Sequence, residues 1–136
     1  MIETQEAVPK HKPQGISMGD IQSANARAGL HWFEPDTMRF FRSRVGSTIY
    51  EGPGGVFFVS SEQFVGSQGA APRAYTVRVF VTGTGAVDTA DKDFNERSRS
   101  SAVQHAQELA AGKAKCFCLR CRNGSHHLTA TKGDDF

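Results

Sequence analysis

The sequence lacks the features that mark membrane, secreted and strongly charged proteins. Its longest uninterrupted apolar run covers only residues 56–59, far short of the roughly 20 residues that a membrane-spanning helix needs. The first 15 residues contain no apolar segment typical of a signal peptide. The 16 Lys and Arg nearly balance the 14 Asp and Glu, which excludes an acidic mimic of DNA and does not by itself indicate nucleic-acid binding. We therefore expect a cytoplasmic protein.

Cysteine is also scarce, because the 136 residues include only three, all between positions 116 and 121. An odd number of Cys within six residues cannot form a framework of disulfides that joins distant parts of a fold. This usage fits a reducing compartment. The three thiols are then free, metal-bound or sensitive to oxidation.

The length and the 38% hydrophobic content suffice for one domain with a modest core. We expect a flexible N-terminal arm over residues 1–15, a single α+β domain over residues 16–112, and a flexible Cys/His-containing tail over residues 113–136.

Three segments have a helical pattern. Asp20 is placed to cap a short helix that ends at Gly29. Residues 36–45 follow a proline and repeat apolar side chains at helical spacing, which predicts a second helix. A third helix is expected over residues 101–111, where Ser101 and a following Gln form a capping-box pattern.

Four segments read as strands. Residues 48–50 are short and rich in β-forming side chains, and residues 56–61 form a continuous apolar run typical of a central strand buried on both faces. Residues 74–81 alternate between two faces, and residues 86–89 follow a glycine-containing turn as a short edge strand. The predicted fold is α+β, with a three- to four-stranded antiparallel meander backed by helices.

The segments FEPDTMRFFRSRV, FFVSSEQF and YTVR follow one another between residues 33 and 78. As a set they resemble small uncharacterised accessory proteins of bacteriophages and other mobile elements. The resemblance implies a protein that acts in the host-cell cytoplasm, and some such proteins, anti-CRISPR proteins among them, block host defence complexes. It implies no particular catalytic or binding residue.

The tail contains part of a metal-binding pattern. Cys118, Cys121 and His126 match the opening of a zinc knuckle, but Thr131 stands where the last Cys belongs, so Cys116 or His127 must substitute. The candidate zinc ligands are Cys116, Cys118, Cys121 and His126. A flexible tail without metal is favoured over this site, because a zinc site rarely lacks its fourth ligand, and no other cofactor is expected.

Basic side chains suggest nucleic acid as one partner class. They are Arg39, Arg42 and Arg44 of the predicted second helix and Lys115, Arg120 and Arg122 of the tail. The predicted order of helix, three strands and helix is that of a double-stranded-RNA-binding domain. The start of the last helix, however, lacks the lysine cluster of that domain.

Aromatic side chains point to a protein partner instead. Ten Phe in so short a chain, two of them adjacent in the predicted central strand, exceed what one sheet face can easily cover, and aromatic side chains beside Arg often anchor interfaces. We expect a host protein, a nucleoprotein complex or a second copy of the chain to be bound by residues Trp32, Arg39, Arg42, Tyr75 and Arg78.

Catalytic patterns are missing. None of the five His has the spacing of a catalytic triad or of a metalloprotease helix. The glycine-rich segment 52–55 joins two predicted strands, whereas a phosphate-binding loop must lead into a helix. The sequence therefore predicts a non-catalytic binding protein that inhibits a host defence complex, or alternatively a nucleic-acid-binding protein with a partial zinc knuckle.

Overall fold

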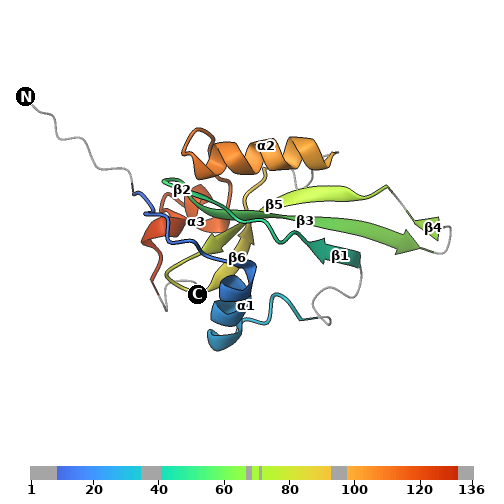
Figure 1. Ribbon diagram of the computed structural model, residues 1–136, viewed down its shortest axis with the longest axis horizontal. Helices are drawn as coiled ribbons and strands as arrows, with labels where there is room; N and C mark the ends of the chain where they lie inside the picture. The colour runs from blue at the N-terminus through green and yellow to red at the C-terminus, as the bar shows by residue number, and fades with distance from the viewer. Residues whose placement is uncertain (1–8, 35–40, 67–68, 71, 93–97, 132–136) are drawn as a thin grey trace, which may run out of the picture.

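The computed structural model describes residues 9–34, 41–66, 69–70, 72–92 and 98–131. The elements follow the order α1 (Met18–Arg27), β1 (Phe41–Val45), β2 (Tyr50–Gly52), β3 (Gly55–Gly66), β4 (Gly69–Ala70), β5 (Ala74–Val81), β6 (Ala86–Thr89), α2 (Arg99–Ala110) and α3 (Leu119–Arg122), with a final 3₁₀ turn at His127–Thr129. Helices lie on both sides of an antiparallel sheet (Figure 1), so the predicted α+β fold is confirmed.

Strand β3 organises the sheet, whose main path runs β1-β3-β5-β6. One edge of β3 pairs with β5 over residues 56–62. Its other pairings are with β2 at its start and with β1 over residues 60–64, while β4 closes a short ladder at its end. The predicted meander is therefore present, and the strands predicted at 74–81 and 86–89 have the bounds of β5 and β6.

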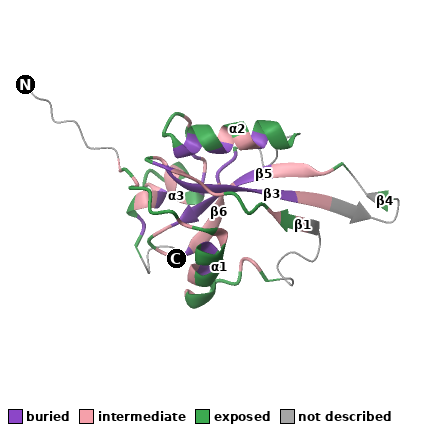
Figure 2. Cartoon of the chain, in the orientation of Figure 1, coloured by how far each residue is buried: buried purple, intermediate pink, exposed green. Residues whose placement is uncertain are grey.

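Both faces of β3 are buried, as the continuous apolar run predicts. Phe57 and Phe58 are adjacent, point to opposite faces and are fully buried. Phe57 belongs to a core under α2, whereas Phe58 belongs to a second core under α1. Figure 2 shows the buried residues along the middle of β3 and β5. Burial of each ring contributes about 1.5–3 kcal/mol, so both helix–sheet layers matter to stability.

The prediction of a helix over residues 36–45 is wrong for its described part. Residues 41–45 form β1, in register with residues 60–64 of β3. Apolar residues at positions 41 and 45 fit the two-residue period of a strand as well as the period of a helix, so the pattern does not discriminate between the two structures. Pairing with the otherwise open edge of β3 outweighs the local helix preference. Residues 36–40 lie outside the described residues.

Two helix starts differ from those predicted. Ser17, not Asp20, caps α1. The Ser17 hydroxyl accepts from the Asp20 amide, and the Asp20 carboxylate accepts from the Ser17 amide, which completes a capping box. Ser98, not Ser101, caps α2 and accepts from the Ser101 amide at 3.2 Å. In both helices the better cap lies three residues upstream of the predicted one.

Residues 9–15 of the predicted flexible arm are fixed to the sheet through Glu51. Its carboxylate accepts hydrogen bonds from His11 Nε2 at 2.6 Å and from the amides of Gln14, Gly15 and Ile16 at 2.7–3.1 Å. The His11 amide also donates to the carbonyl of Pro53 at 3.0 Å. These hydrogen bonds join the predicted arm to the turn region of the sheet.

Candidate metal centre

The segment after α2 packs against the end of the sheet. The Phe117 amide donates to the carbonyl of Ala90 at 2.9 Å, and the Leu119 amide donates to Asp88 Oδ2 at 2.8 Å. Cys116, Cys118 and Ala130 are buried. These contacts join the segment after α2 to the folded body.

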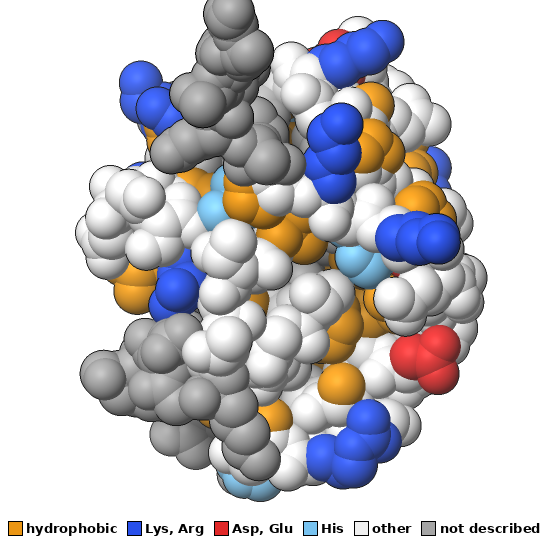
Figure 3. Space-filling model, turned by 90° about the vertical axis from the view of Figure 1, so that its left-hand side faces the viewer, with side chains coloured by type: hydrophobic (Ala, Val, Ile, Leu, Met, Phe, Trp, Pro, Cys, Tyr) orange, Lys and Arg blue, Asp and Glu red, His pale blue; other side chains and the backbone are white. Residues whose placement is uncertain are grey.

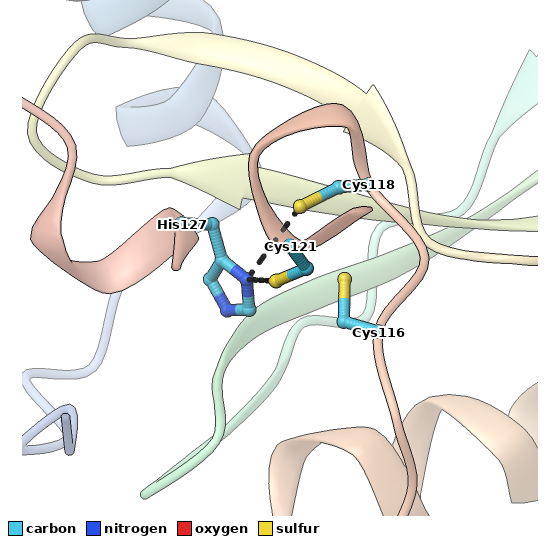
Figure 4. Close-up of side chains that lie close together, drawn as sticks. All are labelled: Cys116, Cys118, Cys121 and His127. Carbon is cyan, nitrogen blue, oxygen red and sulfur yellow. Dashed lines mark hydrogen bonds between the residues drawn. The ribbon is translucent and has the colours of Figure 1, made fainter. Parts of the chain in front are cut away.

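This segment brings four metal-ligating side chains together. They are Cys116, Cys118, Cys121 and His127, whose ligand atoms all lie within 4.8 Å of one another. Figure 4 shows the three sulfur atoms and the imidazole pointing toward a common point. Cys118 caps α3, Cys121 lies within it, and His127 begins the 3₁₀ turn. Helix α3 and the 3₁₀ turn therefore position three of the four side chains.

The distances within this Cys3His cluster fit a tetrahedral zinc ion. His127 Nδ1 lies 3.4 Å from Cys121 Sγ and 3.8 Å from Cys118 Sγ. Zinc bond lengths of about 2.3 Å to sulfur and about 2.0–2.1 Å to nitrogen place neighbouring S and N ligands about 3.6 Å apart in a tetrahedron. The two observed distances bracket that value, and all four ligand atoms lie within 4.8 Å of one another.

A backbone carbonyl selects the ring orientation of His127. Its Nε2 donates to the carbonyl of Gly54 at 2.9 Å, which leaves Nδ1 directed at the sulfur atoms. The ring is 1% exposed and meets the Phe57 ring edge-on at a centroid distance of 5.6 Å. Such a hydrogen bond to the second ring nitrogen is the usual support of a metal-ligating histidine.

The cluster is electrostatically prepared for a cation. Hydrogen bonds from Cys116 and Cys118 lower the pKa of the Cys121 thiol well below its ordinary value, while hydrogen bonds with Cys118 and Cys121 raise the pKa of Cys116. Burial lowers the pKa of His127, but the neighbouring Cys118 and Cys121 sulfurs outweigh burial and raise it to about 9. These shifts favour a thiolate at Cys121 beside a protonated His127, and a cation bound at the cluster would take the place of the protons.

His127, and not the predicted fourth ligand His126, belongs to the Cys3His cluster. His126 Nδ1 accepts from the Leu128 amide at 3.1 Å and caps the 3₁₀ turn. Adjacent His residues look equivalent in a spacing pattern. The Gly54 carbonyl, which lies 73 residues away in the chain, distinguishes them, and no local signal reveals it.

Basic side chains surround the loop that carries the cluster. Phe117 lies between two of the ligands, and the amines of Lys115 and Lys92 lie 5.4 and 5.9 Å from the centroid of its ring. Arg122 Nε donates to the Phe117 carbonyl at 2.9 Å. Leu119 next to them is 51% exposed. We call Lys92, Lys115, Phe117, Leu119 and Arg122 the basic loop surface.

A cleft of about 550 Å³ borders the cluster. Its walls include Pro9, Lys10, Leu109, Cys121 and His127. Figure 3 views the end of the molecule that carries β2 and α3, where Lys and Arg side chains surround an apolar area. This end of the molecule is therefore positively charged as well as rich in metal ligands.

Of the predicted partner-binding residues, the three with described side chains lie on two different faces of the sheet. The Arg78 guanidinium lies 5.4 Å from the centroid of the Trp32 ring and donates to Ser60, Glu62 and Thr89. Tyr75 packs on the opposite core, under α2. Arg42 lies in β1 without a described side chain, and Arg39 lies outside the described residues.

The described aromatic rings are sheltered within the chain. Among the described side chains, the exposed large hydrophobic ones are Leu30 and Leu119, and neither is aromatic. Trp32 and Phe33 pack over Phe58 at centroid distances of 6.0 and 6.2 Å. The two-sided core thus shelters the described rings in full or in part, whereas the side chains of Phe40, Phe41, Phe64, Phe94 and Phe136 lie outside the described set.

Comparison with known proteins adds a family but no activity. No curated protein and no solved structure matches the chain significantly. In the part of the chain that the structure describes, no helix is long and apolar enough to span a bilayer. A family model matches residues 17–108, from the cap of α1 to near the end of α2, and ends before the Cys3His cluster. Because the matched segment is more than half of the chain, this protein belongs to DUF7447, a family of unknown function.

Proposed function

We propose that the protein binds one Zn²⁺ ion through Cys116, Cys118, Cys121 and His127. The observation that carries the proposal is the convergence of these four donor atoms within 4.8 Å. Three thiolates and one imidazole are the borderline-soft ligands that zinc prefers in a tetrahedral site. Harder ions such as Mg²⁺ and Ca²⁺ favour oxygen ligands, and none of the four side chains supplies one.

The role of this ion is structural. Four protein ligands fill a tetrahedral site, whereas a catalytic zinc keeps one position for water or substrate. The ligands tie the C-terminal segment to itself, and the bond from His127 to Gly54 connects it to the turn between β2 and β3. Zinc thereby holds the basic loop surface in a fixed conformation.

The basic loop surface is suited to single-stranded nucleic acid. Two Lys amines flank the half-buried ring of Phe117, and Arg122 is fixed beside it. Cationic groups contact phosphates, and aromatic rings stack on unpaired bases. This arrangement supports the nucleic-acid-binding alternative more than docking through Trp32 and Arg78, which are engaged within the chain. Inhibition of a host defence complex stays a prediction based on the sequence resemblance.

Metal analysis of the purified protein tests the zinc site. We expect one Zn²⁺ per chain, with loss of metal in Cys121→Ser and in His127→Ala and retention in the neighbouring His126→Ala. Chelation is expected to lower the melting temperature of the wild type, because metal binding stabilises the folded state. A protein that folds without metal, or His126→Ala and His127→Ala variants with equal zinc content, would contradict the assignment.

Binding of a fluorescent single-stranded 15-mer, as RNA and as DNA, tests the surface. We expect the Lys115→Gln/Arg122→Gln variant to bind at least about tenfold more weakly than the wild type and to show a shallower salt dependence, since each phosphate contact contributes about 0.7 to the slope. The Lys12→Gln/Arg27→Gln variant removes the same charge elsewhere. Equal weakening in both double variants, or no dependence on salt, would contradict the proposed surface.

A further inference from the structure

A second basic site lies at the other end of α2, away from the metal ligands. It is a cleft of about 310 Å³ bordered by β1, β3, β5 and the first residue of α2. Its polar lining includes Arg44, Arg73, Arg99, Tyr50, Tyr75 and Ser61, and no acidic side chain is among the described residues that line it. Its volume is at the lower end of the range for small-molecule sites, about 300–1,000 Å³.

The strand register places the polar groups of the cleft side by side. Arg44 of β1 pairs with Ser61 of β3, which pairs on its other edge with Tyr75 of β5. Side chains of directly opposed residues point to the same face. Arg73 is fixed over this row, because its Nη1 donates to the Ser61 hydroxyl at 2.9 Å and to the Ser61 carbonyl at 3.2 Å. One side of the cleft is therefore organised before any ligand arrives.

The nearest strand carboxylate faces away from the cleft. Glu62 follows Ser61 in β3 and so points to the other face of the sheet, where it accepts from Ser60, Thr76 and Arg78. The side chains of Arg44 and Arg99 are exposed, and no ion pair joins either to a described carboxylate. Three guanidinium groups therefore gather where the described residues supply no negative charge.

We infer that this cleft binds a phosphate-bearing small ligand of mononucleotide size. Guanidinium groups match phosphate oxygens with paired hydrogen bonds. The half-buried rings of Tyr50 and Tyr75 offer flat apolar contacts for a base. This inference does not depend on zinc or on the basic loop surface, since it uses none of their residues.

Calorimetric titration at constant ionic strength tests the inference with the four ribonucleoside 5′-monophosphates. We expect at least one of them to bind saturably, and its nucleoside and inorganic phosphate to bind at least about tenfold more weakly. Arg44→Gln and Arg99→Gln are expected to weaken the nucleotide to a similar extent. Both residues are exposed, so the variants should fold normally. Arg27→Gln, an equal charge change on exposed α1, should bind as the wild type does.

Several results would overturn the inference. They are the absence of saturable binding for all four nucleotides, equal affinity for the nucleoside or for inorganic phosphate, and equal weakening by Arg27→Gln and Arg99→Gln. A wild-type melting temperature in each variant verifies that any loss of binding is local.

Discussion

At the scale of single residues, the carboxylate of Glu51 provides hydrogen-bond acceptors for a segment that has no regular secondary structure. It accepts four hydrogen bonds from residues 11–16, and its side chain is only 9% exposed. Those donors belong to a stretch without regular secondary structure, so the carboxylate provides partners that a strand would otherwise supply. The segment before α1 is positioned by this single side chain.

Glu51→Gln is therefore expected to lower the free energy of unfolding by about 1–3 kcal/mol at pH 7, since hydrogen bonds to a charged acceptor are lost. Burial raises the pKa of Glu51, but the hydrogen bonds from His11 and the Gln14 and Ile16 amides outweigh it and hold the pKa below its ordinary value of 4.5. This stabilisation is fully present above that value and is lost as the pH falls through the lowered pKa.

Urea unfolding at pH 7 and near pH 3 measures this effect. The difference between wild type and Glu51→Gln should shrink at the lower pH. Glu34→Gln is the matched control, because Glu34 accepts from a single His in an exposed pair. A difference that does not change with pH, or an equal loss in the control, would show that the carboxylate charge is not the cause.

At the scale of elements, the turn between β2 and β3 links the sheet to the metal ligands. Gly54 supplies the carbonyl that orients His127. Gly55 has a φ of +131°, and an added Cβ there would lie 2.7 Å from His127 Nε2. The turn thus requires glycine both for its backbone conformation and for the space that the imidazole fills.

Gly55→Ala should therefore displace His127 and weaken zinc binding by about 10–100-fold, the usual effect of disturbing the support of a metal ligand. Competition with a chromophoric chelator measures the affinity. Gly29→Ala is the control, since Gly29 also has a positive φ, +75°, but has open space around its Cβ position. Unchanged zinc affinity in Gly55→Ala would refute the role given to the turn.

The sequence predicts a helix or strand correctly where the apolar residues fit only one of the two periods. It predicts poorly where they fit both. The alternation of Ala74–Val81 fits only a strand, and its bounds are confirmed. The apolar residues at positions 41 and 45 fit the period of a helix and that of a strand, and pairing with the distant β3 decides between the two structures. The three Cys of the cluster could be recognised from their spacing, whereas the choice between His126 and His127 depends on a long-range hydrogen bond.

At the scale of the whole molecule, helices lie on both faces of one sheet, and basic side chains gather near both ends of α2. The Cys3His cluster and, except for Lys92, the basic loop surface follow α2 in the chain. The cleft lined by Arg44, Arg73 and Arg99 lies at the N-terminal end of α2. Asp91 ties the helix between them to the sheet, because it accepts from the Val77 amide and pairs with His105 at 2.8 Å each. The family match covers this scaffold and not the metal ligands.

The hydrogen bond between Gly54 and His127 also bears on the order of events during synthesis. The ribosome releases the turn at Gly54 long before it releases the last ligand, 73 residues later. A chain that ends before His127 lacks the fourth member of the Cys3His cluster. If the cluster binds zinc as proposed, such a chain loses one ligand and leaves its three thiols open to oxidation.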